Sequence, residues 1–190
     1  FSLTCNNATT SAKFLPTLPT SGTLYSSDNE TLLNGLYHSK PSNYEAVPEG
    51  SADEIGDPAR ELIELIPTRD SLLVVKEDGI WRVTGETERN LTIKPLETTV
   101  FGKAPNSWVS FDNAAWGLST LGIVRVTEAG TDLMSRPIDD KISLLLTFSN
   151  FATFSHALAY ESEGLYLFFC QELSTDTSAT IAYVYNNLTQ

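Results

Sequence analysis

Apolar and polar residues alternate in four short segments of the chain, and each segment begins at a glycine. After the glycine comes an apolar residue, then a second bulky residue, then the alternation. The segments are Gly35-Leu36-Tyr37-His38-Ser39, Gly79-Ile80-Trp81-Arg82-Val83, Gly122-Ile123-Val124-Arg125-Val126 and Gly164-Leu165-Tyr166-Leu167-Phe168. Their glycines are 44, 43 and 42 residues apart. Such a regular spacing indicates an internal structural repeat.

Each segment is interpreted as one half of a β-hairpin, because three of the four follow a second strand-like run and a short polar turn. We expect hairpins near residues 24–40, 72–84, 115–127 and 157–169. Weaker strand patterns fill the intervals, at residues 91–94, 107–111, 142–146 and 181–185. This gives about four strands per repeat, which is typical of β-propeller blades, whose sheets bury their faces against neighbouring blades.

The predicted fold is therefore all-β, with propeller-like repeats of about four antiparallel strands. Residues 1–190 are expected to form a single β-propeller-like domain or a fragment of one, because propellers usually have four to eight blades and close into a ring. A β-sandwich with coincidental spacing is the alternative fold. One helix is predicted over residues 58–66, where Asp57 is a candidate cap and Pro58 would occupy the first helical position. Residues 44–57, which are acidic and contain Pro and Gly, are expected to form a loop between blades.

Composition excludes several classes of protein. The chain has 12 Lys and Arg against 24 Asp and Glu, a formal charge of −12, whereas proteins that grip nucleic acid need clustered basic residues. Hydrophobic residues make up 41% and charged residues 19%, as in an ordinary globular chain. No apolar run is long enough to span a bilayer, so no membrane association is expected.

No candidate catalytic centre emerges from the reactive side chains, and we expect no enzyme activity, no cofactor and no metal. His38 and His156 are interpreted as strand residues, and Cys5 and Cys170 as plain thiols, although the sequence leaves open whether they are bonded. Phosphate-binding glycine loops and Trp-Asp repeats are absent from the sequence. Two acidic groups could supply a carboxylate pair for glycoside hydrolysis, but solvated loops are their simpler interpretation; these are Asp139 with Asp140, and Asp53 with Glu54 and Asp57. The three tryptophans, Trp81, Trp108 and Trp116, lie in strand patterns and are expected to pack in the core.

Several stretches, taken in order, resemble tail proteins of short-tailed bacteriophages. The longest is ELIPTRDSLLVVKEDGIWRVTG, residues 64–85. Shorter stretches agree in order and spacing and extend the likeness over most of the chain from Asn34; they are residues 34–41, 105–109, 112–119, 121–126, 135–138 and 182–189. The resemblance places part of the predicted helix at 58–66 in a strand. The family forms the tail nozzle, or DNA-stabilisation ring, and contains β-propellers.

The resemblance implies a structural protein of the virion, made in the host cytoplasm, which helps to retain and eject viral DNA. It also implies a hexameric ring of the full-length protein, with contacts to adaptor, portal and other tail proteins. Under this hypothesis the charge of −12 lets DNA slide past without tight binding. The alternatives are a carbohydrate-binding or glycoside-hydrolysing β-propeller protein and a cellular propeller that serves as a protein-binding platform.

Overall fold

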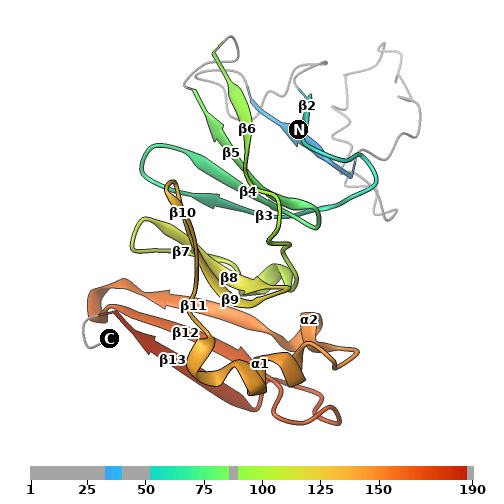
Figure 1. Ribbon diagram of the computed structural model, residues 1–190, viewed down its shortest axis with the longest axis vertical. Coiled ribbons are helices and arrows are strands. Elements are labelled where there is room, and N and C mark those ends of the chain that lie inside the picture. The colour runs from blue at the N-terminus through green and yellow to red at the C-terminus, as the bar shows by residue number, and fades with distance from the viewer. Residues whose placement is uncertain (1–32, 40–51, 86–89, 188–190) are drawn as a thin grey trace, which may run out of the picture. The chain divides into compact units, whose positions relative to one another are not determined.

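The computed structural model describes residues 33–39, 52–85 and 90–187, and the chain divides into two compact units, residues 1–61 and 62–190. In the first unit, β1 (Gly35–Tyr37) pairs antiparallel with β2 (Ala52–Glu54) (Figure 1). The Ile55 N–H donates to the carbonyl oxygen of Asn34 at 3.0 Å, and the Ile55 side chain is buried. The strand that follows Gly35 is thus confirmed, whereas residues 24–32 and 40 of the predicted hairpin lie outside the described ranges.

Three antiparallel sheets make up the second unit, and each follows the order of the chain. The first sheet contains β3 (Leu62–Pro67), β4 (Leu72–Lys76), β5 (Gly79–Thr84) and β6 (Thr92–Glu97). Gly79 has φ +148° in the turn from β4 to β5, and a Cβ there would lie 2.7 Å from the Glu97 carbonyl oxygen. Glycine is required at this turn for both reasons, and the hairpin predicted at 72–84 is confirmed.

The second sheet has the same four-strand arrangement. It contains β7 (Val109–Phe111), β8 (Ala114–Ser119), β9 (Gly122–Thr127) and β10 (Gly130–Leu133), and a short 3-10 turn, η1 (Pro105–Ser107), precedes it. The hairpin predicted at 115–127 is confirmed as β8 and β9, with Ser119 paired to Gly122. Every residue of β8 is buried, so both faces of this sheet are covered.

The third sheet has three strands, β11 (His156–Tyr160), β12 (Leu165–Cys170) and β13 (Ile181–Asn186), and the hairpin predicted at 157–169 is confirmed as β11 and β12. A 3-10 turn, η3 (Glu161–Glu163), joins the first two strands. Between β10 and β11 the chain forms a 3-10 turn and two short helices, η2 (Arg136–Ile138), α1 (Asp139–Leu145) and α2 (Phe151–Phe154).

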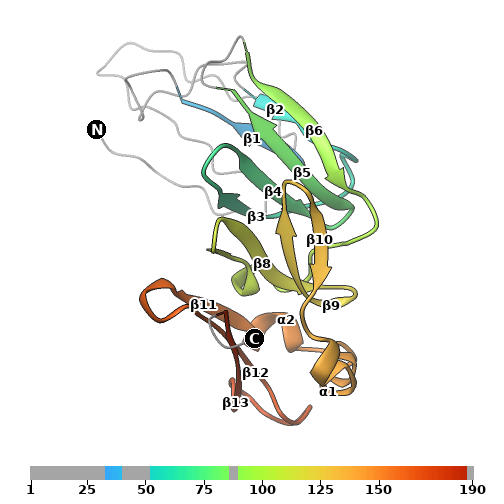
Figure 2. The ribbon, with the colours of Figure 1, turned by 60° about the vertical axis from the view of Figure 1, so that its left-hand side comes forward.

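The three sheets of the second unit pack face to face in chain order (Figure 2). One core, which includes Leu73, Ile80 and Trp108, lies between the first and second sheets. A second core, which includes Trp116, Tyr166 and Phe168, lies between the second and third sheets. The first strands are neighbours, since β7 contacts both β3 and β11, and the fourth strands β6 and β10 also touch. The central sheet is therefore buried on both sides, as a middle blade would be.

The fold is mostly β, as predicted, but several details of the prediction are wrong. Residues 142–145 belong to α1 rather than to a strand, and Leu146 is the C-cap of that helix. Ile142 and Leu145 are buried one helical turn apart, whereas Ser143 and Leu144 between them are exposed. The helix predicted at 58–66 is instead a turn followed by β3, and the expected loop at 44–57 contains β2. The described sheets form neither a closed barrel nor a closed propeller.

The repeat also changes phase at its last member. Gly79 and Gly122 begin the third strands of their sheets, whereas Gly164 lies just before the second strand of the third sheet. Most of the residues predicted as a strand in the preceding interval, 142–146, lie in α1. The glycines are spaced almost regularly along the sequence, but the hairpin at Gly164 occupies a different position in its sheet from those at Gly79 and Gly122.

Candidate functional site

Of the reactive side chains singled out in the sequence, the described part of the chain brings His38 beside Asp53 within the first unit and assembles no larger group that could hold a metal ion. His38 Nε2 lies 3.7 Å from Asp53 Oδ2 in the first unit. In the second unit, His156 stacks on Phe169 with ring centroids 4.9 Å apart. Among the described residues, no group of three or more His, Cys, Asp or Glu side chains could hold a metal ion.

The acidic groups have local structural roles. Asp139 and Asp140 occupy the first turn of α1 and are exposed there, where carboxylates interact favourably with the helix N-terminus. The Asp57 carboxylate accepts a hydrogen bond from the Ala59 N–H at 2.9 Å in the turn before β3. These contacts agree with the surface interpretation of both groups.

Cys170 is a buried free thiol at the end of β12, and Cys5 lies outside the described residues. Only 1% of Cys170 is exposed, and burial raises the pKa of its thiol from 9.0 to about 12. The thiolate is the reactive form of cysteine, so this environment disfavours a nucleophilic role.

The tryptophans of the second sheet pack in the core as predicted, whereas Trp81 is only partly buried. Trp108 and Trp116 are 4% and 1% exposed, and the Trp116 ring lies 5.2 Å from that of Tyr166 and 4.9 Å from that of Tyr185. These aromatic contacts join the second sheet to the third.

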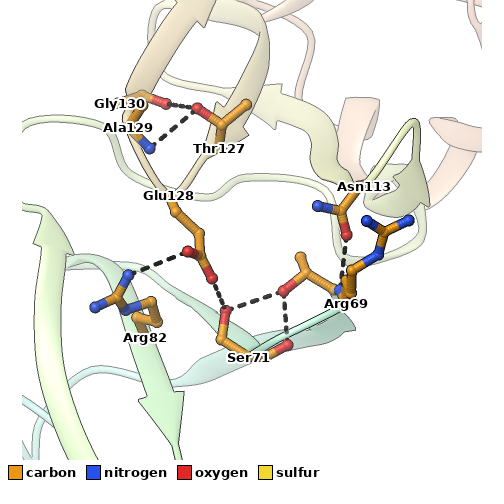
Figure 3. A network of polar contacts seen from close by, with 9 residues as sticks. Arg69, Ser71, Arg82, Asn113, Thr127, Glu128, Ala129 and Gly130 are labelled. Carbon is orange, nitrogen blue, oxygen red and sulfur yellow. Dashed lines mark hydrogen bonds and ion pairs between the residues drawn. The ribbon is translucent and has the colours of Figure 1, made fainter.

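A polar network joins the first and second sheets at one rim (Figure 3). Glu128, in the turn from β9 to β10, lies 3.5 Å from Arg82 Nη1 and accepts a hydrogen bond from Ser71 Oγ at 2.9 Å. The Thr68 hydroxyl lies 2.9 Å from that of Ser71 and donates to the Ser71 carbonyl oxygen at 2.7 Å. The network fixes the turn between β3 and β4 against the neighbouring sheet.

The turn between β7 and β8 reaches the sheets on both sides of it. Asp112 and Asn113 have φ +51° and +52°, which is typical of a two-residue type I′ hairpin turn. Asn113 Oδ1 accepts the Arg69 N–H of the first sheet at 2.7 Å. Asp112 Oδ2 accepts hydrogen bonds from Arg125 Nη2 at 3.3 Å and from the side-chain amide of Asn187 at 3.2 Å. Asn187 lies just beyond β13, the last strand of the third sheet.

One face of the third sheet is apolar and exposed. We call it the outer face; side chains alternate along the three strands, and those that point away from the second core are His156, Leu158, Tyr160, Leu165, Leu167, Phe169, Ala182, Val184 and Asn186. Leu158, Leu167 and Val184 form a row across its centre, where Leu158 is 55% and Val184 57% exposed. No Asp, Glu, Lys or Arg belongs to this face, and exposed apolar patches of this kind mark interaction surfaces.

An apolar cavity of about 170 Å³ lies beside β13, between the second and third sheets. None of its lining residues is charged; they include Trp116 of β8, Met134 just after β10, and Tyr183 and Tyr185 of β13. The indole N–H of Trp116 is buried and has no hydrogen-bond partner among the described residues. No local pattern in the sequence indicates this cavity, because its wall combines residues 116–138 with residues 166–185.

Comparison with protein-family models gives no match to this chain, and comparison with curated protein sequences gives none either. Within the described ranges, none of the helices has the length and apolar character that crossing a membrane requires. The exposed apolar features of the described second unit include the outer face of the third sheet and the cavity beside β13.

Proposed function

We propose that this chain is a structural component of the virion of a short-tailed bacteriophage, a part of the tail nozzle through which DNA is retained and ejected. The observation that carries the proposal is the order of the sheets. Consecutive antiparallel sheets pack face to face, and their first strands β3, β7 and β11 are neighbours. Propeller blades are arranged in this way around their axis, so the sheets are proposed to be part of a β-propeller.

The outer face supports a role in assembly. The second sheet is covered on both faces, whereas the third presents Leu158, Leu167 and Val184 on an uncharged surface. In a propeller such a face would pack against the next blade. In the proposed tail ring, the face is buried by further protein, either in the same subunit or in a neighbouring one.

The acidic charge supports passage of DNA rather than tight binding. With 24 acidic and 12 basic residues, the chain offers phosphates little gain from counterion release. The proposed partners are further copies in a hexameric ring, adaptor, portal and other tail proteins, and DNA that slides past. The proposed role is structural and involves no catalysis.

Two measurements test the proposal. Light scattering on the full-length protein that contains this sequence should give the mass of a ring of about six copies. Fluorescence anisotropy with a labelled 20-base-pair duplex at low salt should show no saturable binding by this chain. A full-length protein that stays monomeric at high concentration, or a duplex that binds tightly, would contradict the tail assignment.

A matched pair of substitutions tests whether the outer face takes part in assembly. Leu158→Lys places a charge at its centre, whereas Leu121→Lys places one on the turn between β8 and β9, where Leu121 is 53% exposed. Made in the full-length protein, Leu158→Lys should reduce the fraction of rings or of folded protein, and Leu121→Lys should leave both unchanged. If both variants form rings and fold to the same extent, the outer face does not take part in assembly.

A further inference from the structure

One dipeptide at the start of β1 is chemically labile. Asn34-Gly35 is the single Asn-Gly sequence in the chain, and glycine has no β-carbon to hinder attack by its backbone nitrogen on the preceding side chain. In that reaction the Gly35 nitrogen bonds to Asn34 Cγ, the Cγ–Nδ2 bond breaks, and Nδ2 leaves as ammonia with the proton of the Gly35 N–H. Water then opens the cyclic imide to aspartate or to isoaspartate, in which the backbone passes through the side chain.

The β1–β2 hairpin holds the two reacting groups apart. The Asn34 side chain is fully buried, and its Nδ2 donates to the Gly56 carbonyl oxygen, two residues after β2, at 3.4 Å. A flipped amide would place Oδ1 against that oxygen, so the hydrogen bond fixes which amide atom faces Gly56. The Asn34 carbonyl oxygen accepts the Ile55 N–H at 3.0 Å, which makes the next pair, Gly35 with Glu54, a non-hydrogen-bonded one. The Gly35 N–H therefore points away from β2, whereas the Asn34 amide is directed at the chain after β2.

The product of the reaction does not fit the closed hairpin. Aspartate at position 34 would place a carboxylate oxygen where Nδ2 now lies, facing the Gly56 carbonyl oxygen, and an unpaired buried charge is costly. Asn34 Oδ1 already lacks a hydrogen-bond donor among the described residues, so none of them would stabilise the charge. Isoaspartate would lengthen the backbone by the β-carbon and shift the pairing of Asn34 with Ile55.

We propose that Asn34-Gly35 is a conditional modification site. It is preserved while the β1–β2 hairpin is closed, and it deamidates when the hairpin opens, after which the hairpin cannot close again. The described sheet of the first unit has two strands of three residues each, and small sheets of this kind open at a lower free energy than a packed core. Deamidation would thus convert a transient opening into a lasting one. The inference rests on contacts within the first unit and does not require the tail assignment.

Deamidation rates test the protection of this site. The whole chain and a synthetic peptide of residues 32–38 are incubated at pH 8, and peptide mapping by mass spectrometry follows the reaction at Asn34. The folded chain should react about tenfold or more slowly than the peptide. Ile55→Ala removes a fully buried side chain next to β2 and should raise the rate toward that of the peptide, whereas Leu65→Ala, at a 42% exposed position of β3, should leave it unchanged. Equal rates in the chain and the peptide, or equal rates in the two variants, would overturn the proposal.

Hydrogen exchange of the Ile55 amide tests whether the modified hairpin stays open, because this N–H donates to the Asn34 carbonyl oxygen. Asn34→Asp introduces the charge of the product and should raise the exchange rate about tenfold or more. Asn34→Ser loses the same side-chain hydrogen bond without a charge and should raise the rate less. If the Ile55 amide of Asn34→Asp is as protected as in the unaltered chain, the hairpin tolerates the product and the proposal is wrong.

Discussion

Asp112 and Asn113 are adjacent in one two-residue turn, and their side chains bond to different neighbouring sheets. Asn113 Oδ1 accepts the Arg69 N–H of the first sheet at 2.7 Å, and Asp112 Oδ2 accepts the Asn187 amide beyond the third at 3.2 Å. The positive φ of both residues directs consecutive side chains apart. A turn of the central sheet thus sets the rim positions of the sheets on both sides of it.

Substitutions at Asn113 should separate the bond to Arg69 from the backbone requirement of the turn. Asn113→Gly keeps the positive φ and loses only the bond, which should cost about 0.5–1 kcal/mol of unfolding free energy. Asn113→Ala loses the bond and also places a β-carbon at positive φ, which should cost about 1 kcal/mol more. Urea denaturation of both variants measures the two costs. If Asn113→Gly and Asn113→Ala lower the unfolding free energy equally, the positive φ at this position imposes no extra cost on a residue with a β-carbon.

Gly117 should be irreplaceable because a tryptophan packs on its backbone. A Cβ at Gly117 would lie 2.2 Å from Trp108 Cδ2, which no real contact allows. Since Trp108 and every residue of β8 are buried, the Trp108 ring has little room to move, and Gly117→Ala should cost about 3 kcal/mol of unfolding free energy. In a Trp108→Leu background the same substitution should cost far less, because the ring is gone. Thermal unfolding of the four proteins of this double-mutant cycle gives the coupling, and additive costs would contradict the contact.

The sequence predicted those parts of the fold that depend on local pattern. The hairpins at 72–84, 115–127 and 157–169 follow from alternation and a glycine at the turn, and all three form. Residues 142–146 were wrongly assigned to a strand because a short run with three leucines fits either structure, and only burial of Ile142 and Leu145 on one side decides for a helix. The repeat period could not show that Gly164 would join the first and second strands, because that depends on where α1 and α2 fall.

The candidate surfaces were much harder to predict. The Asp112-Asn113 pair between two strand patterns is a local signal for a tight turn, but its partners Arg69 and Asn187 lie 44 and 75 residues away. The cavity beside β13 likewise combines residues 116–138 of the second sheet and the segment after it with residues 166–185 of the third sheet. Such sites form only when particular sheets pack side by side, and the local pattern of residues along the chain does not indicate which sheets will do so.

Asp176 should titrate at an unusually low pH in the loop between β12 and β13. Its carboxylate accepts the Thr180 hydroxyl at 2.6 Å and the N–H groups of Leu173 and Glu172 at 3.0 and 3.2 Å. The Thr180 hydroxyl and these N–H groups lower the pKa of Asp176 below 3.8. Because the folded-state pKa is lowered, its contribution to stability is present at neutral pH and is lost as the pH falls through that pKa.

NMR titration of the Asp176 side-chain carboxyl carbon measures this pKa directly. Thr180→Val removes the strongest donor and should move the pKa upward toward 3.8, whereas Thr177→Val, at an exposed position in the same loop, should leave it unchanged. A pKa of 3.8 or above in the unaltered chain would contradict the three hydrogen bonds.

Cys170 should make the protein less stable in alkaline solution. Burial raises the pKa of its thiol from 9.0 to about 12, and burial also raises the pKa of the Tyr166 hydroxyl. Because the folded protein holds this thiol protonated while the unfolded chain ionises near pH 9, the contribution of Cys170 to stability is complete below pH 9 and is lost as the pH rises toward 12. Between pH 8 and pH 10.5 the Cys170 contribution should be about 2 kcal/mol, measured as the difference in urea unfolding free energy. Cys170→Ala should remove this part of the pH dependence and keep the Tyr166 part.

In a Cys5→Ser background, a thiol reagent at pH 8 should modify Cys170 only as fast as the protein unfolds, and rapid modification of the folded chain would contradict its burial.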